Sequence, residues 1–196
     1  MVKLQQKWDA HYAQVDYDKL QPSCALLENS HLIPKQGTAL DLACGLGAGA
    51  LYLAKRGLTT TAWDISPVAI DALQNQALTE RLAVNAEVRD LSVEPLPVKR
   101  FDLIYVANFL ERSLCADIEN ALRPDGVLVY QTWVLGKVTD EGPSNPDFLL
   151  AENELLGLFP NLTVRYFRDE GCLGDLDQGD RNRSVLVAQR VGEKLC

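Results

Sequence analysis

The sequence predicts an α/β fold built on a mostly parallel, doubly wound sheet. From residue 38 to residue 133, apolar runs of strand length alternate with segments of helical periodicity, which is typical of repeated strand–helix units. A glycine-rich turn follows the first apolar run, as it does in parallel sheets that bind cofactors. The last two apolar runs have no helix between them, which favours an antiparallel pair. We therefore expect a parallel sheet that ends in one antiparallel strand.

Seven runs of the chain have the character of strands. Each is short, rich in Val, Ile, Leu or Thr, and bounded by Gly, Asp, Pro or charged residues. The predicted strands span residues 38–43, 58–64, 83–89, 101–107, 126–133, 162–168 and 184–190.

Helices are expected between these strands and at the N-terminus. Ser66 and Pro67 supply an N-cap followed by proline at the first helical position. The run 123–126, Arg-Pro-Asp-Gly, predicts a helix end and a turn into the fifth strand. The predicted helices span residues 4–15, 23–30, 49–56, 67–81, 110–122 and 149–159.

The composition limits the classes of function. A chain of 196 residues with 47% hydrophobic and 23% charged residues predicts one domain with a full core. A net charge of −8 opposes binding to polyanions, because phosphate backbones need clusters of Lys and Arg. We therefore expect no nucleic-acid partner.

Cysteine usage and hydropathy bear on location. The five cysteines are scattered without a C-x-x-C pair and only two histidines accompany them, so neither a disulfide framework nor a metal site is expected. No run approaches the ~18 apolar residues of a transmembrane helix, and the N-terminus is too polar for a signal peptide. The expectation is a cytoplasmic protein with no membrane partner, a monomer or weak homodimer.

The turn ALDLACGLGAGA at 39–50 fits two classes of cofactor. The spacing Gly45-x-Gly47-x-x-Ala50 satisfies the dinucleotide fingerprint, while Gly45-x-Gly47-x-Gly49 satisfies a second pattern. Asp41 separates the two, because a carboxylate before the turn would repel a pyrophosphate and attract a cationic ammonium and sulfonium. These residues favour S-adenosylmethionine over a nicotinamide dinucleotide.

Two further carboxylates stand at the ends of predicted strands. Asp64 ends the second strand about 20 residues beyond the turn, where a carboxylate can accept hydrogen bonds from both ribose hydroxyls. Asp90 follows the third strand and could accept a hydrogen bond from the exocyclic amine of adenine. Ile65 could pack on the adenine face, with Leu91 beside it. The three acids together predict one cofactor site.

The motifs resemble those of a known superfamily. The stretches ALDLACGLGAGALYLAKRG, TAWDISPVAIDAL, VRDL, FDLIYVANFLER and LRPDGVLVYQTW are similar to successive motifs of class I S-adenosylmethionine-dependent methyltransferases. The similarity covers roughly residues 38–133. Within the superfamily, the run 64–70 and the segment 153–155 are most similar to the tellurite-resistance-type small-molecule methyltransferases. The resemblance implies a Rossmann-like seven-stranded sheet of order 3-2-1-4-5-7-6.

The resemblance also implies a set of cofactor-binding residues. One position departs from the family pattern, because alanine at 43 stands where glycine is more usual. The residues implied around the methionine moiety, ribose, adenine and methyl donor are Asp41, Ala43, Gly45, Leu46, Gly47, Asp64, Ile65, Asp90, Leu91, Ala107 and Asn108.

The substrate side is expected to involve the N-terminus. Trp8 and Tyr12 lie at helical spacing, and similar methyltransferases begin with a W-x-x-x-Y segment over the cofactor, although such a pair also suits core packing. In a single methyltransferase domain over 1–196, residues 1–34 would then cover the site and residues 35–196 would form the core. The further candidates for the acceptor pocket are Phe109, Arg112, Trp133, Asn145 and Asn153.

The expected function is methyl transfer from S-adenosylmethionine to a small-molecule acceptor, such as a thiol or a chalcogen oxyanion. Proximity and orientation can supply most of the rate of such a displacement, so no catalytic residue is assigned and His11 is the one candidate base. The acidic run 175–180 is interpreted as a solvated hairpin tip that would disfavour anionic acceptors. The alternatives are a non-catalytic S-adenosylmethionine-binding sensor or scaffold and a nicotinamide-dependent oxidoreductase.

Overall fold

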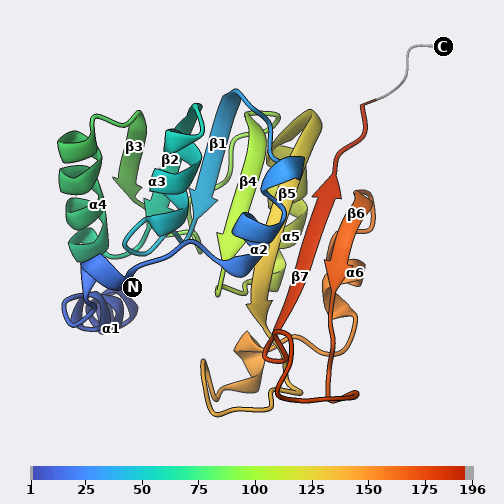
Figure 1. The fold of residues 1–196 in the computed structure, drawn as a ribbon. Helices are drawn as coiled ribbons and strands as arrows, with labels where there is room; N and C mark the ends of the chain where they lie inside the picture. The colour runs from blue at the N-terminus through green and yellow to red at the C-terminus, as the bar shows by residue number, and fades with distance from the viewer. Residues whose placement is uncertain (1, 193–196) are drawn as a thin grey trace.

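A computed structural model describes residues 2–192 of the chain. Its strands are β1 (Gly37–Leu42), β2 (Leu58–Asp64), β3 (Val84–Val88), β4 (Phe101–Ala107), β5 (Leu122–Trp133), β6 (Thr163–Arg168) and β7 (Arg183–Gln189). They form one seven-stranded sheet of order β3-β2-β1-β4-β5-β7-β6 (Figure 1). β7 runs antiparallel to both of its neighbours, β5 and β6, and the pairs among β1 to β5 are all parallel. The predicted fold class and strand order are confirmed.

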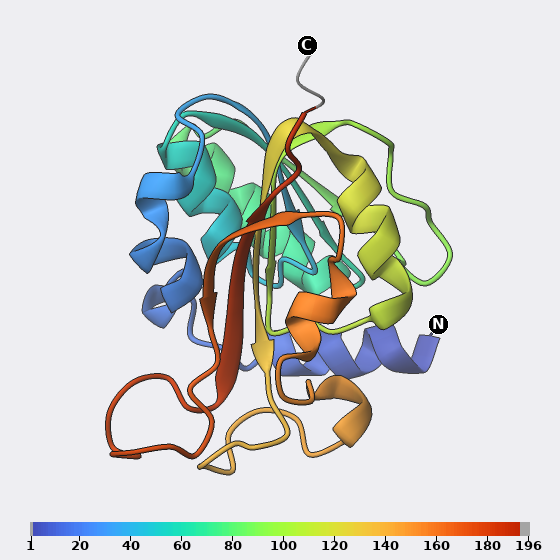
Figure 2. The same ribbon diagram turned by 90° about the vertical axis from the view of Figure 1, so that its right-hand side faces the viewer.

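Helices cover both faces of this sheet. They are α1 (Val2–Tyr12), α2 (Cys24–Glu28), α3 (Ala48–Lys55), α4 (Pro67–Glu80), α5 (Cys115–Ala121) and α6 (Glu154–Leu158). Figure 2 shows α2, α3 and α4 on one face and α5 with α6 on the other. None of the helices in residues 2–192 is long and apolar enough to span a bilayer.

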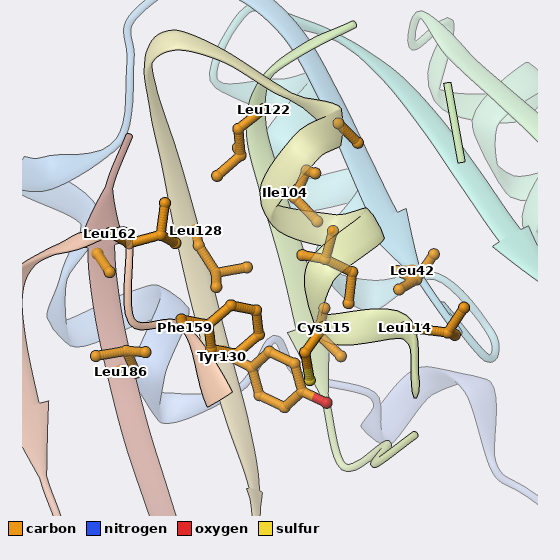
Figure 3. Close-up of a cluster of buried hydrophobic side chains, with 14 of the residues drawn as sticks. Leu42, Ile104, Leu114, Cys115, Leu122, Leu128, Tyr130, Phe159, Leu162 and Leu186 are labelled. Atoms are coloured by element: carbon orange, nitrogen blue, oxygen red, sulfur yellow. The ribbon is translucent and has the colours of Figure 1, made fainter. Parts of the chain in front are cut away.

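The core on the α5 and α6 face contains a buried tyrosine. Tyr130 of β5 is fully buried, and its ring lies 5.5 Å from that of Phe159, which follows α6 (Figure 3). The Tyr130 hydroxyl donates a hydrogen bond of 2.9 Å to the carbonyl oxygen of Phe109. Because a buried hydroxyl needs a partner, this bond fixes the segment that leaves β4.

Two predicted boundaries near β5 were wrong. The strand begins at Leu122 rather than at residue 126, because Leu122 already pairs with Phe101 of β4 before a register shift. The predicted turn is still present within β5, because Asp125 has a φ of +65° where the register between β4 and β5 shifts. The predicted helix 110–122 is accordingly shorter: it consists of a 3-10 turn (Arg112–Leu114) and α5.

The predicted helix 149–159 was also too long. Leu150 lies beside the end of β5, where its N–H donates to the Trp133 carbonyl and its carbonyl accepts from the Leu135 N–H. A segment that pairs with a strand cannot also be helical, so only Glu154–Leu158 form a helix.

The first helix crosses the edge of the sheet at which β1 and β2 end (Figure 1). Asp9 on α1 accepts a hydrogen bond of 2.5 Å from the Ser66 hydroxyl. Ser66 in turn accepts from the Ala69 N–H and thereby caps α4. One serine therefore starts α4 and anchors α1.

Candidate functional site

The glycine turn joins β1 to α3 at the carboxyl edge of the sheet. Ala43, Gly45 and Gly47 have positive φ angles of +55°, +53° and +81°. A Cβ on Gly47 would collide with the side chain of Leu73, so only glycine fits between the turn and α4. The departure from the family pattern at Ala43 is accommodated in the left-handed region, where glycine would be less strained.

Asp41 lies beneath this turn. It is 3% exposed, and burial raises the pKa of its carboxyl to about 8, although the Ala50 N–H at the start of α3 opposes the shift. The nearby Asp64 carboxylate raises the Asp41 pKa further. The site therefore contains an acid whose ionisation a bound cation would favour.

Asp64 closes the turn from the end of β2. Its Oδ2 accepts a hydrogen bond of 2.8 Å from the Gly45 N–H, and its Oδ1 accepts one of 2.9 Å from the Ser66 N–H. Burial raises the Asp64 pKa, while these backbone donors lower it. Because a carboxylate can accept about four hydrogen bonds, Asp64 keeps acceptor capacity for a ligand.

The aromatic residues of α1 cover the turn. A Cβ on Gly45 would lie 3.0 Å from the Tyr12 hydroxyl oxygen, so the tyrosine lies directly over the glycine. Trp8 stacks on Tyr12 with 5.6 Å between ring centroids, whereas His11 is exposed. Burial and the carboxylates of Asp64 and Asp41 raise the Tyr12 pKa, which keeps its hydroxyl protonated.

The predicted adenine-binding residues lie beyond β2 and β3. Asp90 is half-buried, and its carboxylate accepts hydrogen bonds from the N–H and hydroxyl of Ser92, which lower its pKa. Ile65 and Leu91 are half-buried, and Leu91 packs against the core beneath α5.

The sequence analysis did not identify Arg183, a cation that lies at the same edge of the sheet, next to the residues that follow β4. Arg183 opens β7 directly across from Trp133, and its guanidinium lies 3.9 Å from the centroid of the Trp133 indole. Its Nε donates a hydrogen bond of 3.3 Å to the side-chain oxygen of Asn108, which follows Ala107 at the end of β4. The arginine therefore reaches the position predicted for the methyl donor.

The same arginine changes the interpretation of the acidic hairpin tip. Asp180 lies 3.4 Å from the Arg183 guanidinium and 3.9 Å from that of Arg168. The charges of Asp180 and Arg183 are therefore balanced against each other within the protein.

Three of the acceptor-pocket candidates are engaged in loop structure. Arg112 forms two hydrogen bonds of 2.6 and 3.0 Å with the Glu154 carboxylate and donates to the carbonyl oxygens of Asp147 and Leu149. Asn145 accepts from the Asp147 N–H, and Asn153 begins α6 with a φ of +59°. These contacts order the segment before α6.

Trp133 is held between this loop region and β7. It is 9% exposed, and Gly142 lies so close that a Cβ there would collide with the indole. Phe109, the remaining candidate, is half-buried against the core. Among residues 2–192, no three His, Cys, Asp or Glu side chains are placed to hold a metal ion.

Comparison with known proteins agrees with this geometry. Residues 39–126 match a family model described as a methyltransferase domain. Over 149 residues, the chain is 28% identical to the probable S-adenosyl-L-methionine-dependent methyltransferase TehB of Haemophilus influenzae. The aligned region covers 73% of this chain and 51% of that protein. The chain spans about half the length of the curated relatives it matches.

Solved structures share the fold. TehB from Haemophilus influenzae aligns with a TM-score of 0.70 at 20% identity, over 93% of this chain and 67% of its own. A protein solved in work on the conversion of a disulfide bond into a thioacetal group during echinomycin biosynthesis aligns with a TM-score of 0.73 at 22% identity, over 98% of this chain and 94% of its own.

Proposed function

We propose that the protein transfers a methyl group from S-adenosylmethionine to a small-molecule acceptor, because residues 39–126 match a family model described as a methyltransferase domain. The single observation that carries this proposal is the pair of buried carboxylates, Asp41 and Asp64, around the glycine turn.

The residues at the turn fit this cofactor. Asp41 is a buried acid that has no basic partner among residues 2–192, so an ammonium and a sulfonium nearby would favour its ionised form. Asp64 keeps acceptor capacity for ribose hydroxyls beside its backbone donors. A dinucleotide would place its pyrophosphate at the start of α3, where an ionised Asp41 would repel it and only a protonated Asp41 could remain. This argues against a nicotinamide-dependent oxidoreductase.

When bound, S-adenosylmethionine supplies an electrophilic methyl group on a sulfonium. The chain's own residues would hold and shield it: Asp64 orients the ribose, Asp90 and Leu91 meet adenine with Ile65, and Trp8 with Tyr12 excludes water above the turn. Burial also raises the pKa of the Cys44 thiol, which keeps it protonated within the turn. His11, exposed on α1, remains the one candidate base.

The acceptor is a thiol or a chalcogen oxyanion. Either is anionic when reactive, and the Arg183 guanidinium beside Asn108 would contact it near the methyl donor, although Asp180 at 3.4 Å and Glu141 at 3.9 Å partly balance the charge of this arginine. The stacking of Arg183 on Trp133 holds that charge in place.

We propose that residues 1–196 form one domain and that the protein acts in the cytoplasm, as a monomer or weak homodimer, on a small molecule rather than on a nucleic acid or a membrane. The net charge of −8 and the scattered cysteines support these assignments.

Calorimetry with S-adenosylhomocysteine and S-adenosylmethionine tests cofactor binding. We expect binding to the unaltered protein, a loss of tenfold or more in Asp41→Ala and Asp64→Ala, and no change in Asp71→Ala, which alters an exposed carboxylate on α4. Turnover with thiols, selenite and tellurite then separates an enzyme from a sensor or scaffold. Absence of binding to the unaltered protein would overturn the proposal.

A further inference from the structure

The titratable side chains around the glycine turn are all acids, phenols or thiols. They come from two strand ends, the neighbouring strand β4, the turn itself and α1, and they are Asp41, Asp64, Tyr105, Cys44 and Tyr12. No ion pair involves either carboxylate within the part of the chain that the structure describes. The site therefore holds two buried acids and no positive charge of its own.

Asp41 is tightly enclosed. It is 3% exposed and lies directly across from Tyr105 in the pairing of β1 with β4. Its Oδ2 packs against α3, where a Cβ on Gly49 would stand 2.8 Å from that oxygen. The Ala50 N–H favours its charged form. A carboxylate taken out of water without a positive partner is more stable in its neutral form.

Asp64 is better supplied with hydrogen-bond donors than Asp41. The N–H groups of Gly45 and Ser66 donate to its two oxygens at 2.8 and 2.9 Å. Two carboxylates that share a buried site do not ionise at the same pH, because charge on one disfavours charge on the other. Asp64 therefore takes the first negative charge, and Asp41 is the acid that retains a proton.

The surrounding elements supply no competing proton and no compensating charge. Burial raises the pKa of three neighbours, which keeps them protonated at neutral pH: Tyr12, Cys44 and Tyr105. From α1, Asp9 adds negative charge beside Asp64, while His11 is exposed with its ring 5.3 Å from that of Tyr12. The base of α3, Lys55, forms an ion pair of 2.6 Å with Glu80. Asp41 is thus the group whose charge depends on a ligand.

We propose that occupation of the site by S-adenosylmethionine expels a proton from Asp41 to the solvent, so that the cofactor binds more tightly as pH rises. This inference rests on the proposed function. The ammonium and sulfonium supply the positive charge that the site lacks, so Asp41 is ionised while the cation is bound. The O–H bond of the Asp41 carboxyl breaks, its proton passes to the buffer, and the carboxylate remains beside the cation.

The direction of the pH effect follows from the two states of Asp41. In the free protein, burial raises the pKa of its carboxyl to about 8, whereas a bound cation lowers that pKa. At a pH between the two values, each bound cofactor displaces a proton, so the affinity falls about tenfold for each unit by which the pH decreases. Above about pH 8, Asp41 is already ionised and the affinity no longer changes.

Calorimetry of the full chain in buffers of different ionisation enthalpy counts the protons released per cofactor bound. At about pH 6.5 we expect about one proton for S-adenosylmethionine and none for 5′-methylthioadenosine, which has neither ammonium nor sulfonium. Asp41→Asn should release none, and its affinity should stay constant from about pH 6 to 8. Asp71→Asn, which alters an exposed carboxylate on α4, should match the unaltered protein.

Infrared spectroscopy gives a second readout that does not require the variant to bind. The unaltered free protein at about pH 6.5 should show the C=O band of a protonated carboxyl, which S-adenosylmethionine removes and which free Asp41→Asn lacks. Circular dichroism verifies that the variant folds.

The proposal is overturned if S-adenosylmethionine binds without releasing a proton, if 5′-methylthioadenosine releases as many, or if folded Asp41→Asn keeps the proton release. Absence of S-adenosylmethionine binding at every pH would overturn the proposed function itself, whereas binding without proton release overturns only this inference.

Discussion

Asp41 and Gly49 lie so close together that the glycine has no room for a side chain. A Cβ on Gly49 would stand 2.8 Å from the Asp41 Oδ2 and would collide with the ring of Tyr105 from β4. Both neighbours are buried, so neither can move away without disturbing the core. The third glycine of the turn thus serves the packing of α3 on the sheet.

Gly49→Ala should therefore lower the free energy of unfolding by about 2 kcal/mol, the usual cost of overpacking a core. Gly157→Ala is the matched control: Gly157 lies in α6 and its Cβ would meet no atom within 4 Å, so we expect a gain of about 0.5 kcal/mol. Urea denaturation measures both values. Equal effects of the two substitutions would contradict the packing argument.

The protonation of Asp41 should make the free energy of unfolding depend on pH. Burial raises its pKa to about 8, whereas an unfolded chain has a value near 3.9. The folded state therefore retains a proton that the unfolded state releases, and stability falls as pH rises from about 4 to 8. Between about pH 5 and 8, Asp41→Asn should remove a decline on the order of 3 kcal/mol. Parallel stability profiles of the two proteins would refute this.

Tyr12 and Gly45 should be energetically coupled. Gly45 has a φ of +53°, and a Cβ there would lie 3.0 Å from the Tyr12 hydroxyl oxygen, so Gly45→Ala adds both backbone strain and a clash. Removing the ring with Tyr12→Ala should relieve only the clash. A double-mutant cycle on unfolding free energies should give a coupling of about 1 kcal/mol, and strict additivity would show that the two residues are not in contact.

Arg112 should stabilise the segment before α6. Arg112→Ala removes the hydrogen bonds to Glu154 and to two backbone carbonyls, which should cost about 1 kcal/mol for a half-exposed cluster and speed amide exchange at 146–151. Arg165→Ala, which removes only an exposed contact with Gln189, should change neither quantity. Unaltered exchange in Arg112→Ala, with a changed KM for the acceptor, would instead assign Arg112 to the acceptor pocket.

Replacing two buried threonines, Thr132 and Thr60, by valine should change stability in opposite directions. Thr132→Val removes a hydroxyl that has no hydrogen-bond partner in the described part of the chain and should be neutral or stabilise by about 1 kcal/mol. Thr60→Val removes a hydroxyl that donates to the Leu58 carbonyl and should destabilise by about 1 kcal/mol. Thermal unfolding compares the two, and a destabilised Thr132→Val would mean that a bound water satisfies this hydroxyl.

The sequence predicted what depends on local pattern. The strand order, the glycine turn and the carboxylates at the ends of β1 and β2 follow from periodicity, turn chemistry and family resemblance, and the structure places Asp41 and Asp64 together. These features are encoded within short windows of the chain.

What the sequence did not reveal depends on pairing between distant segments. Arg183 was missed because its contact with Trp133 requires the register of β5 against β7, which no local pattern specifies. The length of α6 was overestimated because the pairing of Leu150 with Trp133 overrides helical periodicity. The pair of buried hydroxyls on Thr132 and Ser184 was missed for the same reason. The two residues are 52 positions apart, and each alone is ordinary in a strand.

The docking of α1 has a consequence for how ligands enter and leave. An isolated helix of 11 residues is marginal in water, and α1 is anchored through Asp9 to Ser66, 57 positions away, and through Tyr12 over Gly45. Detaching it breaks none of the pairings within the sheet. Undocking of this one helix would uncover the glycine turn while the sheet stays intact, which gives a bound cofactor a route of exchange that needs no global unfolding.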